Sequence, residues 1–170
     1  MSDLDAVDLA LVVLRVSLGV VFIAHGYNHV FGGGKIAGTA RWFESLGMRP
    51  GPLHAWTASI TELGSGVLLL LGLLTPLACA GVVGTMVVAL VTNHLRNGFF
   101  IFRPGEGYEY VMTLILVAIA LAGLGGGEWS LDNALDIFQP GGWLGLGIAA
   151  VAGGGGAAGL LAVFWRPAPK

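Results

Sequence analysis

The sequence predicts an all-α integral membrane protein, a bundle of antiparallel helices that cross the bilayer. Hydrophobic residues make up 55% of its 170 residues and charged residues only 11%, whereas roughly a quarter of the residues in a soluble domain are charged. The apolar residues also gather in stretches of about 20, the length of a membrane-spanning helix. This length of chain suits one membrane domain of four or five helices.

The apolar stretches predict spanning helices over residues 7–28, 54–74, 76–96, 108–124 and 143–165. Between the first two lies a polar, glycine-rich segment that includes a predicted short interfacial helix over residues 39–46. Its Trp42 and Phe43 suit the headgroup zone of a membrane. Thr75 is predicted to cap the third helix, and Pro76 to take its first position, where no backbone N–H is needed.

The last apolar stretch contains four consecutive glycines, Gly153–Gly156, and allows two interpretations. Such a run occurs in flexible linkers, but the apolar flanks favour a helix with a glycine face. Small residues let another backbone approach closely in lipid, and Gly155 and Gly159 have the spacing of such an interface. We therefore divide the chain into a four-helix domain, residues 1–135, and an additional helix with a short tail, residues 136–170.

Charge and cysteine content exclude several classes of function. The net charge is −2 and the eight Lys and Arg residues are spread along the chain, so no basic patch for nucleic acid is expected. The one cysteine, Cys79, rules out an internal disulfide, a CxxC redox pair and a cysteine-ligated iron–sulfur cluster. The first residues are acidic and carry no Lys or Arg, unlike a signal peptide.

The basic residues also predict the orientation of the chain in the membrane. Five spans place seven of the eight basic residues on one side, namely Lys35, Arg41, Arg49, Arg96, Arg103, Arg166 and Lys170. The positive-inside rule makes that side cytoplasmic and leaves the N-terminus outside. We expect a multi-pass protein of a bacterial inner membrane, in contact with membrane lipid.

Four proton-active side chains are predicted to lie in the same half of the membrane, near the cytoplasmic side: His25, Glu62, His94 and Glu109. Each comes from a different helix, and ionisable residues within spans are costly enough to indicate a functional site. We expect a polar cavity between them. The histidines nearer the interfaces, His29 and His54, are expected to be water-exposed.

Three interpretations of this cluster stay open on the residues alone. It can tie the helices together as a structural pair, or exchange protons with a bound quinone. It can also hold a metal, although the Glu-x-x-His signature of di-iron bundles is absent; paired His25 and His94 could hold haem. Arg15, inside the first helix, is expected either to extend toward Asp8 or the acidic loop after the fourth span, or to form an ion pair with Asp132.

Several stretches of the chain resemble the DoxX family. They include LRVSLGVVFIAHGYNHVFG, RWFESLGM, ELGSGVLLLLGLLTPLACAGVVGTMV, NHLRNGFF, GYEYVMTLILVAIALAGLG and EWSLDNAL, from about residue 9 to residue 135. The resemblance implies a four-helix membrane bundle. The named members of the family include subunits of a thiosulfate:quinone oxidoreductase. The polar positions that match are Arg15, His25, Glu62, His94, Glu109 and Asp132.

Taken with the resemblance, these residues predict a subunit of a quinone-linked redox complex, with other membrane proteins as partners. The chain has no recognisable redox centre of its own, so no covalent cofactor is expected and the enzymatic status stays open. Cys79 lies toward the opposite side from the cluster, so direct sulfur chemistry is not expected. The alternatives are an accessory subunit that docks through the glycine-rich last helix, and a small-molecule carrier.

Overall fold

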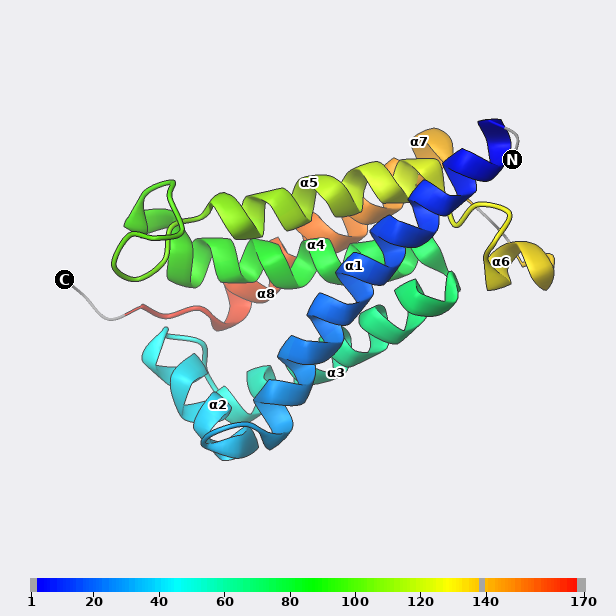
Figure 1. Cartoon of the computed structure of the whole chain (residues 1–170). Coiled ribbons are helices and arrows are strands. Elements are labelled where there is room, and N and C mark those ends of the chain that lie inside the picture. Colours follow the sequence, from blue (N-terminus) through cyan, green and yellow to red (C-terminus); the bar gives the residue numbers. More distant parts are fainter. Residues whose placement is uncertain (1–2, 138–139, 168–170) are drawn as a thin grey trace.

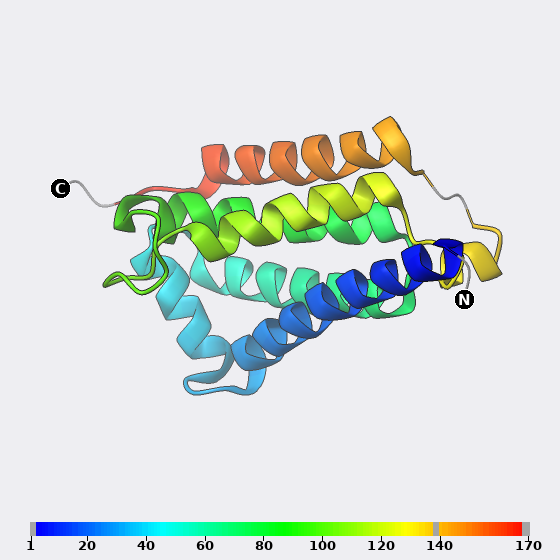
Figure 2. The ribbon, with the colours of Figure 1, turned by 45° about the horizontal axis from the view of Figure 1, so that its top comes forward.

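The computed structural model describes residues 3–137 and 140–167. Within these residues every regular element is a helix, apart from a single bridge between Met48 and Trp165. The long helices run side by side and the short ones lie at the two ends of the bundle (Figures 1 and 2). The predicted all-α bundle is confirmed.

The elements follow the predicted order. They are α1 (Asp3–Phe31), α2 (Lys35–Ser45), α3 (Gly51–Leu71), α4 (Thr75–Ala89), the short π-helix η1 (Leu90–His94), the short 3-10 helix η2 (Leu95–Asn97), α5 (Glu109–Leu124), α6 (Leu131–Ala134), α7 (Gly142–Gly147), the short π-helix η3 (Ile148–Gly154) and α8 (Gly155–Phe164). By length and composition, three helices could cross a membrane: Leu4–Phe31, Thr75–Asn97 and Gly142–Phe164; α5 is apolar but shorter.

The two ends of the bundle differ in character. One end, which we call the α6 end, holds the start of α1, the α3–α4 connection, α6 and the start of α7 (Figure 1). The other, the α2 end, holds α2, the α4–α5 connection and the end of α8 (Figures 1 and 2). The basic side chains of the α2 end are Lys35, Arg41, Arg49, Arg96, Arg103 and Arg166. Lys170 lies outside the described residues.

Glycine allows α1 and α3 to pack closely. A Cβ at Gly19 would overlap the carbonyl oxygen of Gly66, and a Cβ at Gly66 would overlap that of Gly19. Nearer the α2 end, a Cβ at Gly26 would press against Leu63 of α3. Small residues at facing positions bring helix backbones together in this way, so α1 and α3 form one closely packed layer.

The last helix is continuous, since α7, η3 and α8 follow one another without a break through the glycine run. Its inner face repeats a small residue every four positions: Gly145, Ala149, Gly153 and Ala157 are all buried. A Cβ at Gly153 would overlap the Ala80 carbonyl oxygen of α4, and a Cβ at Gly145 that of Ala122 in α5. Gly155 and Gly159 are not part of this contact, since a Cβ at either would meet open space, and the interface predicted at this pair stays a prediction.

The start of α4 also differs from the prediction. Thr75 is not its cap; the N-cap is Leu74, in a left-handed conformation with φ 48°. The carboxylate of Asp132, from α6, accepts the backbone N–H groups of Leu74 at 2.7 Å and Thr75 at 3.0 Å, and also the Thr75 hydroxyl at 3.1 Å. A distant acidic residue therefore satisfies the free N–H groups of this helix terminus.

Arg15 and Asp132 do not form the predicted ion pair, because the guanidinium has other partners. Both carboxylate oxygens of Asp132 already accept hydrogen bonds from the start of α4. Arg15 instead extends to the acidic loop after the fourth span, as the other interpretation predicted, and is only 2% exposed. Its guanidinium donates to the carbonyl oxygens of Leu69 at 3.4 Å and Trp129 at 2.6 Å, and so joins α1 to α3 and to the loop before α6.

Candidate functional site

A cavity of about 750 Å³ lies between α1, α3, α4 and the last helix, and extends to α2 and the α4–α5 connection. Most of its walls are apolar, among them Phe22, Phe43, Met48 and Leu68. Polar side chains interrupt this lining, namely histidines, Glu62 and several hydroxyl and amide side chains. An apolar cavity with few, grouped polar side chains is the usual form of a small-molecule site.

The central polar contact joins α1 and α3. His29 Nδ1 lies 3.0 Å from Glu62 Oε2, and the two side chains are 16% and 4% exposed. The atoms are at ion-pair distance, yet their angles do not make a hydrogen bond and neither atom has another partner. The two atoms are therefore close without a hydrogen bond between them, and each keeps capacity for a better-aligned partner.

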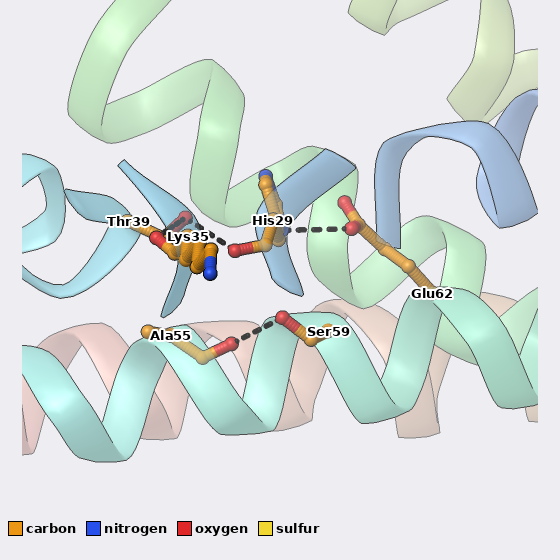
Figure 3. A network of polar contacts seen from close by, with 6 residues as sticks. All are labelled: His29, Lys35, Thr39, Ala55, Ser59 and Glu62. Atoms are coloured by element: carbon orange, nitrogen blue, oxygen red, sulfur yellow. Dashed lines mark hydrogen bonds and ion pairs between the residues drawn. The ribbon is translucent and has the colours of Figure 1, made fainter. Parts of the chain in front are cut away.

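Local contacts hold this pair in place. The Thr39 hydroxyl of α2 donates to the His29 carbonyl oxygen at 2.9 Å, where α1 nears its end and carbonyls lack helical partners (Figure 3). Ser59, one turn before Glu62, turns its hydroxyl back to the Ala55 carbonyl oxygen at 2.7 Å (Figure 3). Neither hydroxyl competes for the His29–Glu62 pair, which stays available to a ligand.

A second histidine, His54, is buried at the α2 end of the same cavity. It is 3% exposed, and its Nε2 has no hydrogen-bond partner. The imidazole packs against Phe43, with ring centroids 6.2 Å apart, and edge-on against Phe164 of α8 at 5.1 Å. Phe43 also contacts His29, with centroids 6.4 Å apart, so one aromatic ring links the two histidines.

The expectation that His29 and His54 are water-exposed interface residues is wrong. They lie near the predicted interface, but α2 folds back over the ends of α1 and α3 and covers both rings. The sequence did carry a signal for this burial. His54, Ala58 and Glu62 follow at four-residue spacing on one helix face, and His29 continues the three-and-four spacing that begins at Arg15.

The four predicted site residues fall into different places. Glu62, His25 and His94 line the cavity, His25 as an exposed side chain and His94 half-buried. Glu109 does not line it. The buried face of α5 instead consists of Val111, Leu114, Ala118, Leu121 and Ala122, which leaves Glu109 on another side of its helix.

His94 already uses both of its ring nitrogens. Nδ1 donates to the carbonyl oxygen of Glu106 at 3.0 Å, and Nε2 accepts from the Asn93 amide at 3.2 Å. These bonds leave no nitrogen for an iron atom shared with His25. No group of three or more His, Cys, Asp or Glu side chains in the described residues is close enough to hold a metal ion, so this geometry favours neither the haem nor the di-iron interpretation.

Comparisons with known proteins agree with the membrane setting. The DoxX family model matches residues 10–95. The chain is 30% identical over 140 residues to the uncharacterized membrane protein Rv3486 of Mycobacterium tuberculosis, covering 75% of this chain and 82% of that protein. It is 28% identical over 116 residues to a Bacillus subtilis protein named "Putative oxidoreductase CatD", covering 68% and 81%. No solved structure matches the chain.

Proposed function

The chain is a member of the DoxX family of membrane proteins, and on that premise we propose that it is the quinone-binding membrane subunit of a redox complex. The observation that carries the proposal is the buried His29–Glu62 contact at the wall of a mainly apolar cavity. The oxidoreductase name of the Bacillus relative also supports a redox role.

The cavity chemistry suits a quinone. Phe22, Phe43 and Met48 provide apolar surface for a ring, and an imidazole beside a carboxylate can give or take a proton at a ring oxygen. A quinone takes up two electrons and two protons when it is reduced to the quinol. The sequence contains no recognisable redox centre, so the proposal assigns the electrons to a partner protein and the protons to His29 and Glu62.

The cavity also has exposed residues on its rim, which suits a ligand dissolved in the membrane. His25 of α1 and Tyr110 of α5 are exposed and line the same cavity, as do Ile60 of α3 and Leu77 of α4. These residues come from the long helices and not from the loops. We therefore propose that the ligand enters sideways from the bilayer of a bacterial inner membrane, in the half that faces the cytoplasm.

A binding titration tests the site directly. The purified chain in lipid nanodiscs is titrated with a short-tailed quinone, and the quenching of tryptophan fluorescence is followed, since Trp42 lines the cavity. Glu62→Gln is expected to weaken binding at least about tenfold, because hydrogen bonds to charged groups are worth about 1.5–3 kcal/mol. The matched control is Glu128→Gln, an exposed carboxylate in the α5–α6 loop, which should bind like the wild type. Equal binding by all three proteins would contradict the proposal.

The exposed outer face of the last helix supports the second part of the proposal, the binding of a partner subunit. The outer face of this helix exposes Trp143 (90%), Val151 (73%) and Val163 (60%), and Gly155 and Gly159 have open space before them. A partner helix could approach the backbone closely there. Native mass spectrometry of the complex, extracted gently from its own membrane, should show a second redox protein or a quinone. A homo-oligomer that carries only phospholipid would favour a structural subunit or a carrier.

A further inference from the structure

We propose that His54 is the second hydrogen-bonding group of the cavity, and that the ligand is a ring with an oxygen at each of two opposite edges, as in a 1,4-quinone or its quinol. This inference rests on the proposed quinone site and narrows it. It assigns one ring oxygen to the His29–Glu62 pair and the other to His54.

His54 is buried without a hydrogen-bond partner for its Nε2. Its side chain is 3% exposed, yet Nε2 makes no hydrogen bond. Leaving a buried polar nitrogen unpaired is costly, and native structures rarely do so without a reason. A ligand that supplies the missing partner removes this cost.

His54 and Glu62 lie on the same helix, at a distance that suits a ligand with two separated oxygens. Both lie on α3 and both line the cavity. Eight residues separate them, which is about 12 Å along a helix that rises ~1.5 Å per residue. The two polar groups are therefore separated along the cavity, as required for contact with two separated oxygens.

Apolar side chains lie between His54 and the His29–Glu62 pair. Phe43 contacts both His29 and His54, and Ala58 lies between His54 and Glu62 on α3. Ring faces and edges pack well against such surfaces. A ring with oxygen only at its edges would place its carbon atoms against Phe43.

The imidazole can offer a nitrogen to the cavity without repacking. It lies between Phe43 and Phe164, and it lines the cavity. A half-turn about its Cβ–Cγ bond exchanges ring nitrogens with ring carbons, and this torsion has two near-equivalent states in histidine. The ring can therefore present a nitrogen where a carbon faced the ligand.

The test compares two probes that differ by one oxygen, trimethylhydroquinone and the trimethylphenol that lacks one of its hydroxyls. Both are titrated anaerobically against the full chain in nanodiscs. His54→Phe keeps a ring between Phe43 and Phe164 and removes both nitrogens. It is expected to weaken the hydroquinone about tenfold and to leave the phenol unchanged. His54→Gln, which keeps a hydrogen-bonding group, should recover part of the affinity.

A second readout separates this role from a structural one. Without ligand, His54→Phe should unfold at the same temperature as the wild type or higher, because it removes a buried unpaired nitrogen. A lower unfolding temperature together with an unchanged hydroquinone affinity would show a structural histidine and overturn the inference. Equal weakening of both probes would also overturn it, since His54 would then only shape the cavity.

The two proposals fail in different ways. If Glu62→Gln weakens the hydroquinone but His54→Phe does not, the quinone site stands and the role of His54 is overturned. If neither probe binds the wild type, both proposals are overturned together.

Discussion

Asp132 stabilises a helix that begins 57 residues before it in the chain. Its carboxylate accepts three hydrogen bonds from Leu74 and Thr75 at the start of α4, and its backbone N–H donates to the Gly72 carbonyl oxygen at 3.0 Å. The negative charge also lies near the buried guanidinium of Arg15, close enough to attract it. One side chain thus connects α6 to the α3–α4 connection and balances a buried cation.

Asp132→Asn is therefore expected to destabilise the protein by about 2 kcal/mol, the sum of a weakened helix cap and a lost charge beside Arg15. An amide supplies one acceptor oxygen and turns an NH₂ group toward donors. Thermal unfolding in mild detergent measures the change. Asp136→Asn, an exposed carboxylate just after α6, should stay within about 0.5 kcal/mol of the wild type. Similar losses in both variants would contradict a specific role for Asp132.

His29 and Glu62 should also show their contact in a double-mutant cycle. Glu62→Leu alone leaves His29 Nδ1 buried beside an apolar group, and His29→Leu alone leaves the carboxylate in the same position. Each single change is expected to cost about 2–3 kcal/mol. The double change removes both polar groups and should cost clearly less than the two single changes combined, by at least about 1 kcal/mol. Strict additivity in detergent unfolding would show that the two side chains do not interact.

At the scale of one element, the last helix distinguishes its glycines by the space before them. Gly153→Ala places a methyl group against the Ala80 carbonyl oxygen and should cost about 1–3 kcal/mol. Gly155→Ala and Gly159→Ala meet open space and should stabilise the helix by up to about 1 kcal/mol, since alanine is the better helix former. Opposite signs in unfolding measurements are expected. The same sign at all three positions would mean that α4 does not pack against Gly153.

The elements illustrate what apolar patterning can predict. It located each long helix to within a few residues, because burial in lipid requires long apolar stretches. It did not identify which glycines face the core, because glycine on either side of a helix has the same hydropathy. The interface follows Gly145, Ala149, Gly153 and Ala157, a four-residue period that starts before the glycine run.

The cap of α4 shows a second kind of limit. Local sequence favours Thr75 as the capping residue, since threonine precedes proline there. The group that satisfies the helix terminus is a carboxylate far along the chain, and no local pattern encodes such a contact. The same holds for α2, which covers His29 and His54: its amphipathic sequence predicted an interfacial helix, but not the side chains beneath it.

At the scale of the whole molecule, the two ends of the bundle should lie on opposite sides of the membrane. The one native cysteine, Cys79, is fully buried, so introduced cysteines can be labelled selectively. Asp136→Cys, near the α6 end, should react with a membrane-impermeant maleimide in intact cells. Arg103→Cys, in the α4–α5 connection, should react only after lysis, because the basic end is expected to face the cytoplasm. The reverse pattern would invert the proposed orientation.

The candidate site was predictable in part. Depth within the spans brought His25, Glu62 and His94 to one cavity, because antiparallel helices return to the same membrane half. Depth alone could not select Glu109, whose helix turns other residues inward. Nor could it reveal His54, whose burial depends on Phe43 from α2 and Phe164 from α8, two elements that are far from it in sequence.

The contact between the end of α8 and the α2–α3 connection affects how the protein is made and handled. Arg166 donates its backbone N–H to the Gly47 carbonyl oxygen at 2.8 Å, and the Trp165 indole donates to that of Leu46 at 3.0 Å. A growing chain therefore completes the wall beside His54 only when its final helix has been translated and inserted. Affinity tags for binding experiments belong at the N-terminus, since a fusion directly after Arg166 would strain these two hydrogen bonds.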